Sequence, residues 1–176
     1  MDAATLRSLQ APLKARYRAA PESARVPARA EATLDQHALA CLVSARGRSV
    51  EAGLHPAAGG DGSLACSADL LLEALVACAG VTLTAVATAM GIELRGGRII
   101  AEGEWDARGT LGVDRAVPVG LTDVRLTFAL ETDADPALLE RLLATTERYC
   151  VILQTLRAPP HLSLALDHAA KPAGRS

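Results

Sequence analysis

The sequence is short of aromatic residues. Only four of its 176 residues are phenylalanine, tryptophan or tyrosine, and these are Tyr17, Trp105, Phe128 and Tyr149. A pocket in this protein is therefore expected to be lined by aliphatic side chains, which excludes a site built from stacked rings. Neither positive nor negative charge is in large excess, because the formal net charge is −2. This balance gives no reason to expect nucleic acid or a membrane surface as the main partner.

The cysteines lack the spacing of a metal site. Cys41, Cys66, Cys78 and Cys150 include no C-x-x-C pair, and no paired histidines accompany them, so no metal ion is expected. The first residues lack the apolar core and cleavage site of a secretory signal, which predicts a cytoplasmic protein. Thiols stay reduced in that compartment, so structural disulfides are not expected. Each thiol is then either an inert core residue or a reactive group.

The length fits one domain with a buried core, preceded by a short extension. Residues 1–29 are predicted to form a helical extension, with an amphipathic helix over 5–19 that is interrupted or restarted at Pro12. Its excess of positive charge suits a solvated helix, and a nucleic-acid arm is the alternative. Residues 30–168 are expected to form the single domain, and 169–176 a flexible tail.

Apolar and polar residues alternate over several segments, which predicts strands. We expect two strands over 28–45 and 48–55, joined by a hairpin with Arg46 and Arg48 at its tip. Further strands are expected over 97–109, 121–132 and 161–168. The order of strands and helices therefore predicts an α+β fold.

A helix is expected to follow the fourth predicted strand. Asp135 suits its N-cap and Pro136 its first position. The residues at spacings of four, three and four then share one face, and they are Leu139, Leu143, Thr146 and Cys150.

A long apolar helix is predicted over 69–90. Ser67 fits its N-cap, Asp69 its first turn and Gly91 its end, and no charge occurs from Ala74 onward. A membrane span is one alternative, but interspersed threonine and glycine make the segment only mildly apolar. A helix that is apolar on every face must be covered on every side, which one small sheet cannot do. We therefore expect an intimate homodimer that covers this helix.

Two fragments carry a family likeness. "SADLLLEALVACAGVTL", around Cys78, and "ERYCVILQTL", around Cys150, resemble the two cysteine motifs of the OsmC/Ohr family of osmotically inducible and organic-hydroperoxide-resistance proteins. The resemblance implies an α+β OsmC-like fold, with antiparallel sheets around a long buried central helix in an intertwined homodimer. It also implies thiol-dependent reduction of organic or lipid hydroperoxides, in which Cys78 is the peroxidatic cysteine and Cys150 the resolving one. An external dithiol reductant and no cofactor are expected.

The resemblance further implies an arginine and an acidic residue that activate the thiol. We assign Arg48 on the first hairpin and Asp69 at the head of the central helix to these roles. Nine residues separate Asp69 from Cys78, so the two lie on opposite faces of a helix, and Asp69 could act only by holding an arginine from elsewhere.

Neighbouring positions on the central helix are the expected substrate-binding residues, namely Glu73, Leu75 and Thr82. Two positions depart from the family pattern, because Val151 and Cys66 stand where many relatives have proline. The alternative is therefore a non-enzymatic dimer that binds a small apolar ligand in its interfacial pocket.

Overall fold

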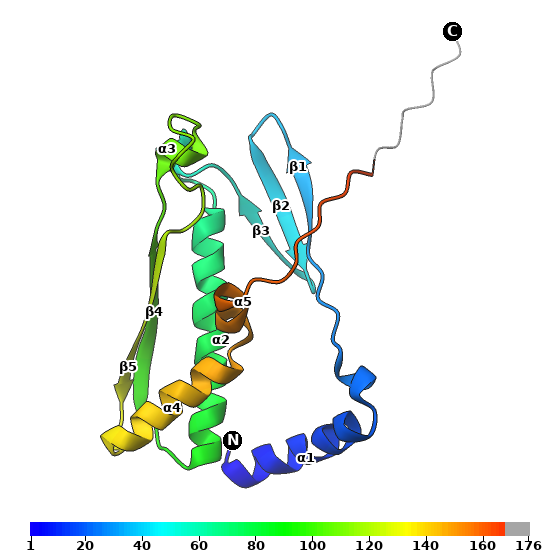
Figure 1. Cartoon of the computed structure of the whole chain (residues 1–176), viewed down its shortest axis with the longest axis vertical. Helices are drawn as coiled ribbons and strands as arrows, with labels where there is room; N and C mark the ends of the chain where they lie inside the picture. Colours follow the sequence, from blue (N-terminus) through cyan, green and yellow to red (C-terminus); the bar gives the residue numbers. More distant parts are fainter. Residues whose placement is uncertain (168–176) are drawn as a thin grey trace, which may run out of the picture.

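The structure is a computed structural model that describes residues 1–167, so the predicted tail at 169–176 lies outside the described residues. It combines five α-helices and five strands in the described part of the chain (Figure 1). They are α1 (Ala3–Ala19), β1 (Glu31–Asp35), β2 (Ala40–Ala45), β3 (Arg48–Ala52), α2 (Ser67–Met90), β4 (Gly96–Glu104), α3 (Ala107–Thr110), β5 (Asp123–Glu131), α4 (Pro136–Tyr149) and α5 (Val151–Arg157). The predicted α+β composition is confirmed.

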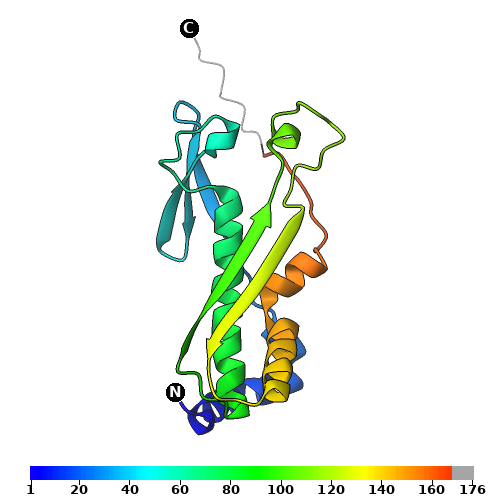
Figure 2. The same cartoon turned by 90° about the vertical axis from the view of Figure 1, so that its left-hand side faces the viewer.

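The long helix α2 organises the core. The antiparallel β4–β5 sheet covers one side of α2, and α4 packs beside it (Figure 2). The residues enclosed between these elements are aliphatic and form the core cluster of Leu83, Ala87, Ile92 and Leu142. One stripe of α2 is therefore buried within the chain, at four-residue spacing from Leu75 to Ala87.

The two ends of α2 differ in how they are capped. Cys66, and not Ser67 as predicted, occupies the N-cap position, and its side chain makes no capping hydrogen bond. At the other end Gly91 adopts a left-handed conformation with φ of 70°, which glycine reaches without steric cost. This lets the Ile92 N–H donate to the carbonyl of Ala87 at 2.9 Å and end the helix.

A second sheet stands apart from this core. Strands β1, β2 and β3 form an antiparallel sheet that lies beside the N-terminal half of α2 and does not pair with β4–β5 (Figure 1). The predicted hairpin is present, with Arg46 and Gly47 both at positive φ in a two-residue turn. Most side chains of this sheet are exposed within the single chain.

The single strand predicted over 28–45 is wrong, because the chain turns between β1 and β2. The carboxylate of Asp35 accepts hydrogen bonds from the N–H groups of His37 and Ala38 at 2.9 and 3.1 Å, and Leu39 takes a positive φ. Such a side-chain turn competes with a continuous ladder.

Two further expectations at the ends of the chain need correction. Helix α1 continues through Pro12 and lies across the C-terminal end of α2 (Figures 1 and 2). Because α1 buries none of its residues, water can satisfy the carbonyl that proline leaves free. The strand expected over 161–168 is absent from 161–167, because its exposed leucines find no strand to pair with in the described chain, and residue 168 is outside that part.

The outer face of α2 stays apolar and exposed. Val81 is 72% exposed, and Ala74 and Ala77 on the same side are exposed as well. The expected burial on every side is therefore not supplied by one chain. By length and composition alone α2 could also cross a membrane, which is weak evidence because core helices of soluble proteins meet the same criteria.

Candidate functional site

The two motif cysteines meet where α2 contacts the α4–α5 junction. Cys78 lies half-buried in the middle of α2, and Cys150 links α4 to α5 with none of its surface exposed. The N–H of Cys150 donates to the Thr146 carbonyl at 2.9 Å, and its carbonyl accepts from the Gln154 N–H at 2.9 Å. The backbone thus fixes Cys150 on both sides.

Hydrogen bonds around Cys78 favour its thiolate. Burial raises the pKa of the Cys78 thiol, but hydrogen bonds from the Ile152 N–H, the Cys150 thiol, the Val151 N–H and the Thr82 hydroxyl together hold that pKa below its ordinary value. Each of these donors stabilises negative charge on the sulfur. The first backbone N–H groups of α5 supply two of the four, so the approach of α5 to α2 creates this environment.

Cys150 has the opposite tendency. Burial raises the pKa of the Cys150 thiol, and the hydrogen bond to Cys78 and the charge on Cys78 raise it further, which outweighs the Leu153 and Ile152 N–H groups. Of the two thiols, Cys78 therefore loses its proton first, and Cys150 stays protonated and donates to it. The pair is set up as one nucleophile and one neutral thiol.

The pH dependence of alkylation is the first prediction that follows. Because the thiolate is the reacting form, the rate for Cys78 should rise with pH to a midpoint lower than that of an ordinary cysteine, and the midpoint for Cys150 should be higher than that of an ordinary cysteine. Short pulses of iodoacetamide, followed by peptide mass spectrometry, measure both midpoints. Since midpoints do not depend on access, the burial of Cys150 does not bias the comparison. A lower midpoint at Cys150 would contradict this assignment.

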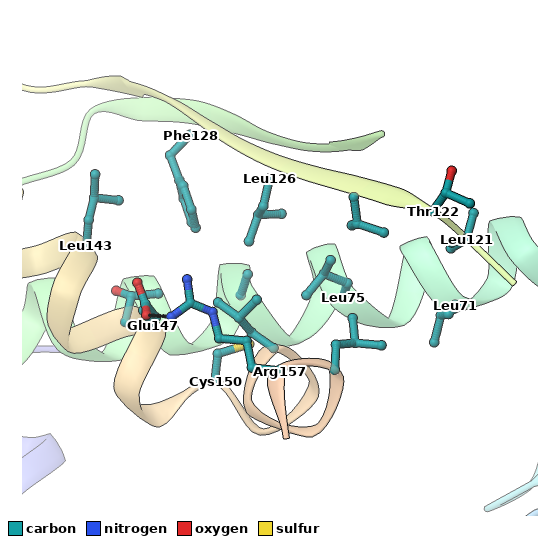
Figure 3. Close-up of a pocket in the computed structure, with 15 residues that line it drawn as sticks. Leu71, Leu75, Leu121, Thr122, Leu126, Phe128, Leu143, Glu147, Cys150 and Arg157 are labelled. Atoms are coloured by element: carbon teal, nitrogen blue, oxygen red, sulfur yellow. Dashed lines mark hydrogen bonds and ion pairs between the residues drawn. The ribbon is translucent and has the colours of Figure 1, made fainter. Parts of the chain in front are cut away.

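A cavity of about 610 Å³ adjoins the cysteine pair on the Cys150 side. It lies between β5 and the three helices α2, α4 and α5 (Figure 3). Aliphatic residues and one phenylalanine form most of its walls, among them Leu71, Leu75, Leu126, Phe128 and Leu143. The expected aliphatic pocket is therefore present, and it lies within one chain.

Polar groups occur mainly along the α4–α5 side of this cavity. Arg157 forms an ion pair with Glu147, and both side chains line the cavity together with Thr146 and Cys150. Thr146 is 1% exposed, and its hydroxyl has no hydrogen-bond partner. The cavity therefore combines apolar walls with one cation, one carboxylate and one buried hydroxyl.

The structure brings some of the predicted site residues together. Leu75 lines the cavity, fully buried, and Thr82 lies one turn after Cys78 on α2 and is among the groups that lower the pKa of Cys78. Glu73 and Asp69 are exposed on α2 and do not line this cavity. Arg48 begins β3 in the separate sheet, and it is not among the groups that shift the pKa of Cys78 within one chain. Its role, like that of Asp69, stays a prediction.

The sequence reasoning missed Glu147 and Arg157 in the cavity, and it missed helix α5, which carries Arg157. Helix α5 was not predicted, although "VILQTLR" contains neither glycine nor proline and follows α4 directly. The pairing of Glu147 with Arg157 depends on how α5 turns back against α4, which no local pattern reveals. Within residues 1–167 no cluster of three or more His, Cys, Asp or Glu residues is arranged to hold a metal ion.

Comparisons with known proteins support this fold. Among solved structures, an OsmC-like protein from Mycoplasma pneumoniae matches with a TM-score of 0.64 and 16% identity, covering 76% of this chain and 89% of that one. An organic hydroperoxide resistance protein from Elizabethkingia anophelis matches with a TM-score of 0.62 and 16% identity, covering 77% and 91%.

The organic hydroperoxide resistance protein OhrB of Bacillus subtilis matches with a TM-score of 0.53 and 18% identity, covering 76% of this chain and 93% of that one. At these identities the likeness shows the fold alone. No curated protein matched. A family model described as OsmC-like protein matches residues 60–165, which include both motif cysteines and more than half of the chain. The chain therefore belongs to the OsmC-like protein family.

Proposed function

We propose that the protein reduces organic hydroperoxides through the thiols of Cys78 and Cys150. The observation that carries this proposal is the packing of α2, which bears Cys78, against the α4–α5 junction that holds Cys150, where the pKa of Cys78 is lowered and that of Cys150 is raised. The apolar cavity beside Cys150 favours organic hydroperoxides over hydrogen peroxide. Family members named as organic hydroperoxide resistance proteins add support at the level of the fold.

The reaction needs two thiols and an external reductant. The Cys78 thiolate attacks the terminal oxygen of the hydroperoxide, the O–O bond breaks, and the alkoxide leaves and takes up a proton as the alcohol. Cys78 is then a sulfenic acid, and the sulfur of Cys150 displaces its hydroxyl, which leaves as water with the thiol proton. A small dithiol or dithiol protein reduces the resulting disulfide by exchange and is itself oxidised. We place this cycle in the cytoplasm, where such reductants are present.

A homodimer is part of the proposal. The exposed side of α2 and the adjoining strand β4 border an apolar groove of about 690 Å³ that includes Gly80, Val81 and Ile99. An aliphatic groove of this kind is costly to leave in water, and small residues such as Gly80 allow a second backbone to approach closely. A second copy would also bring another Arg48 hairpin to the dimer, which is the route by which that residue could reach a thiolate.

The test is disulfide mapping after a single addition of peroxide. Reduced protein receives one equivalent of cumene hydroperoxide, and mass spectrometry maps the disulfides over time. The proposal expects rapid formation of a Cys78–Cys150 bond while Cys41 and Cys66 stay reduced. Slow and unselective oxidation of all four thiols would count against it, and would favour a non-enzymatic dimer that binds a small apolar ligand.

A further inference from the structure

The helix break at Cys150 separates one backbone donor from its usual acceptor. In a continuous helix the N–H of Val151 would donate to the carbonyl of Glu147, four residues earlier. Cys150 instead has extended dihedral angles, with φ of −75° and ψ of 106°, so α4 ends before it and α5 begins after it. Among the described residues, no hydrogen bond joins the Val151 N–H to the Glu147 carbonyl. The break therefore releases both groups for other partners.

The side chain of Gln154 takes the released carbonyl. Its Nε2 donates to the Glu147 carbonyl at 2.8 Å, and its backbone N–H donates to the Cys150 carbonyl at 2.9 Å. Gln154 thus supplies donors to two carbonyls at the end of α4, where the helix itself has none to offer. Because the Glu147 carbonyl already has a donor, it gains little from a bond that would continue the helix through Val151.

The released N–H of Val151 turns to Cys78. Together with the N–H of Ile152, it lowers the pKa of the Cys78 thiol. Helix α2 packs against α1, β4, α4 and α5, but no charged side chain of these elements or of α2 itself is among the groups that shift this pKa. The thiol of Cys150 is the one titratable group among them. The N–H groups at the break therefore matter more to the thiolate than any described charge.

An ion pair joins α5 to the same residue of α4. Arg157, at the end of α5, pairs with the carboxylate of Glu147, whose carbonyl accepts from Gln154 (Figure 3). Both charged side chains are partly exposed, so the pair contributes little stability by itself. It does restrict the direction in which α5 leaves the break.

Valine at position 151 makes this arrangement necessary. The family resemblance leads us to expect proline there, and proline interrupts a helix by itself. Valine does not, and "ERYCVILQTLR" contains no glycine or proline that would end α4. The interruption must therefore be stabilised by side chains, and Gln154 supplies the bond from α5 to the last turn of α4.

We propose that Gln154 is a positioning residue for the reactive sulfur: by capping the Glu147 carbonyl it keeps the α4–α5 break open, so that the N–H of Val151 stays directed at Cys78. The ion pair of Arg157 with Glu147 assists by holding α5 in the same direction. Without the Gln154 amide, the Val151 N–H returns to the Glu147 carbonyl and the thiolate loses a donor. The inference deepens the proposed function and rests on it for the role of Cys78 as the nucleophile.

The experiment measures the pH dependence of iodoacetamide alkylation at Cys78 in reduced, full-length Gln154→Met. Methionine keeps the length and helix propensity of glutamine and removes the donor. The midpoint should rise by about half a pH unit, because one of several donors to the thiolate is lost. The melting temperature should change by less than about 2 °C, because Gln154 is exposed. Thr155→Val is the matched control, because that hydroxyl donates within α5, to the Val151 carbonyl, and its loss should leave the midpoint unchanged.

Val151→Pro provides a second, independent readout. Proline removes the N–H and interrupts the helix whatever residue 154 is, so this variant should raise the Cys78 midpoint by itself. Adding Gln154→Met to it should raise the midpoint no further, because both changes remove the same donor.

The ion pair is tested by changing each partner separately. Glu147→Gln and Arg157→Gln change the net charge in opposite directions, yet both should raise the Cys78 midpoint, because each releases α5. Opposite shifts would show a direct effect of charge on the sulfur and would overturn the part assigned to the ion pair.

Two results would overturn the positioning role of Gln154, namely an unchanged midpoint in Gln154→Met, whatever its melting temperature, or additive shifts in the double variant. Alkylation needs no peroxide, so this test is separate from that of the peroxidase. An unchanged midpoint with rapid formation of the Cys78–Cys150 disulfide would keep the peroxidase and remove the positioning role. A raised midpoint without that disulfide would do the reverse.

Discussion

Serine in place of Cys78 is expected to abolish hydroperoxide consumption, reducing it to the uncatalysed rate. A serine hydroxyl stays protonated at neutral pH and cannot form a sulfenic acid, so the four hydrogen bonds that stabilise the thiolate have no charge to act on. Consumption of cumene hydroperoxide with excess dithiothreitol, followed by a colorimetric peroxide assay, measures the effect.

Cys150→Ser should behave differently from Cys78→Ser. Its first turnover remains, because Cys78 still attacks the peroxide, and a trapping reagent such as dimedone should then label one sulfenic acid per chain. Cys41→Ser is the matched control, since this half-buried cysteine lies in the separate sheet and should leave turnover unchanged. Peroxide consumption that survives in Cys78→Ser would exclude Cys78 as the nucleophile.

The second large effect concerns the core that holds Cys150 in place. Leu142→Ala should lower the free energy of unfolding by about 3 kcal/mol, because Leu142 is fully buried and its removal leaves a cavity against Leu83 and Ala87. Denaturation by urea at fixed protein concentration gives this value.

Leu138→Ala on the same helix is the control for Leu142→Ala. Leu138 is 37% exposed, so its truncation should cost less than half as much. Equal losses at the two positions would show that the α4 face assigned to the core is wrong. Because Cys150 directly follows α4, the peroxide-driven disulfide should also form more slowly in Leu142→Ala.

The fold was predictable where one residue decides the local backbone. Asp135 accepts a hydrogen bond from the Ala137 N–H at 2.8 Å and Pro136 starts α4, as predicted, and Gly91 ends α2. The turn at Asp35 was missed because the sequence over 28–45 also fits the alternating pattern of a single strand. The strand expected over 161–168 failed for a different reason: a strand needs a partner, and the pattern of a segment does not say whether one exists.

The candidate site was predictable only as far as its cysteines. Cys78 and Cys150 could be singled out by the two motifs, and Leu75 and Thr82 by their places near Cys78 on α2. Thr146 was placed on the right helix face, but its unpaired hydroxyl depends on the cavity that β5 and α5 enclose. The pairing of Arg157 with Glu147 likewise exists only after α5 has packed, so the sequence alone could not show it.

Val151 departs from the expected motif around Cys150, but its backbone N–H contributes to the cysteine site. Its side chain is exposed, and the family resemblance leads us to expect proline at this position. Proline has no backbone N–H, whereas the N–H of Val151 is one of the donors that stabilise the Cys78 thiolate. Valine at this position therefore supplies a main-chain hydrogen-bond donor that proline would lack. A thiolate that is stabilised by backbone N–H groups depends less on any one arginine side chain.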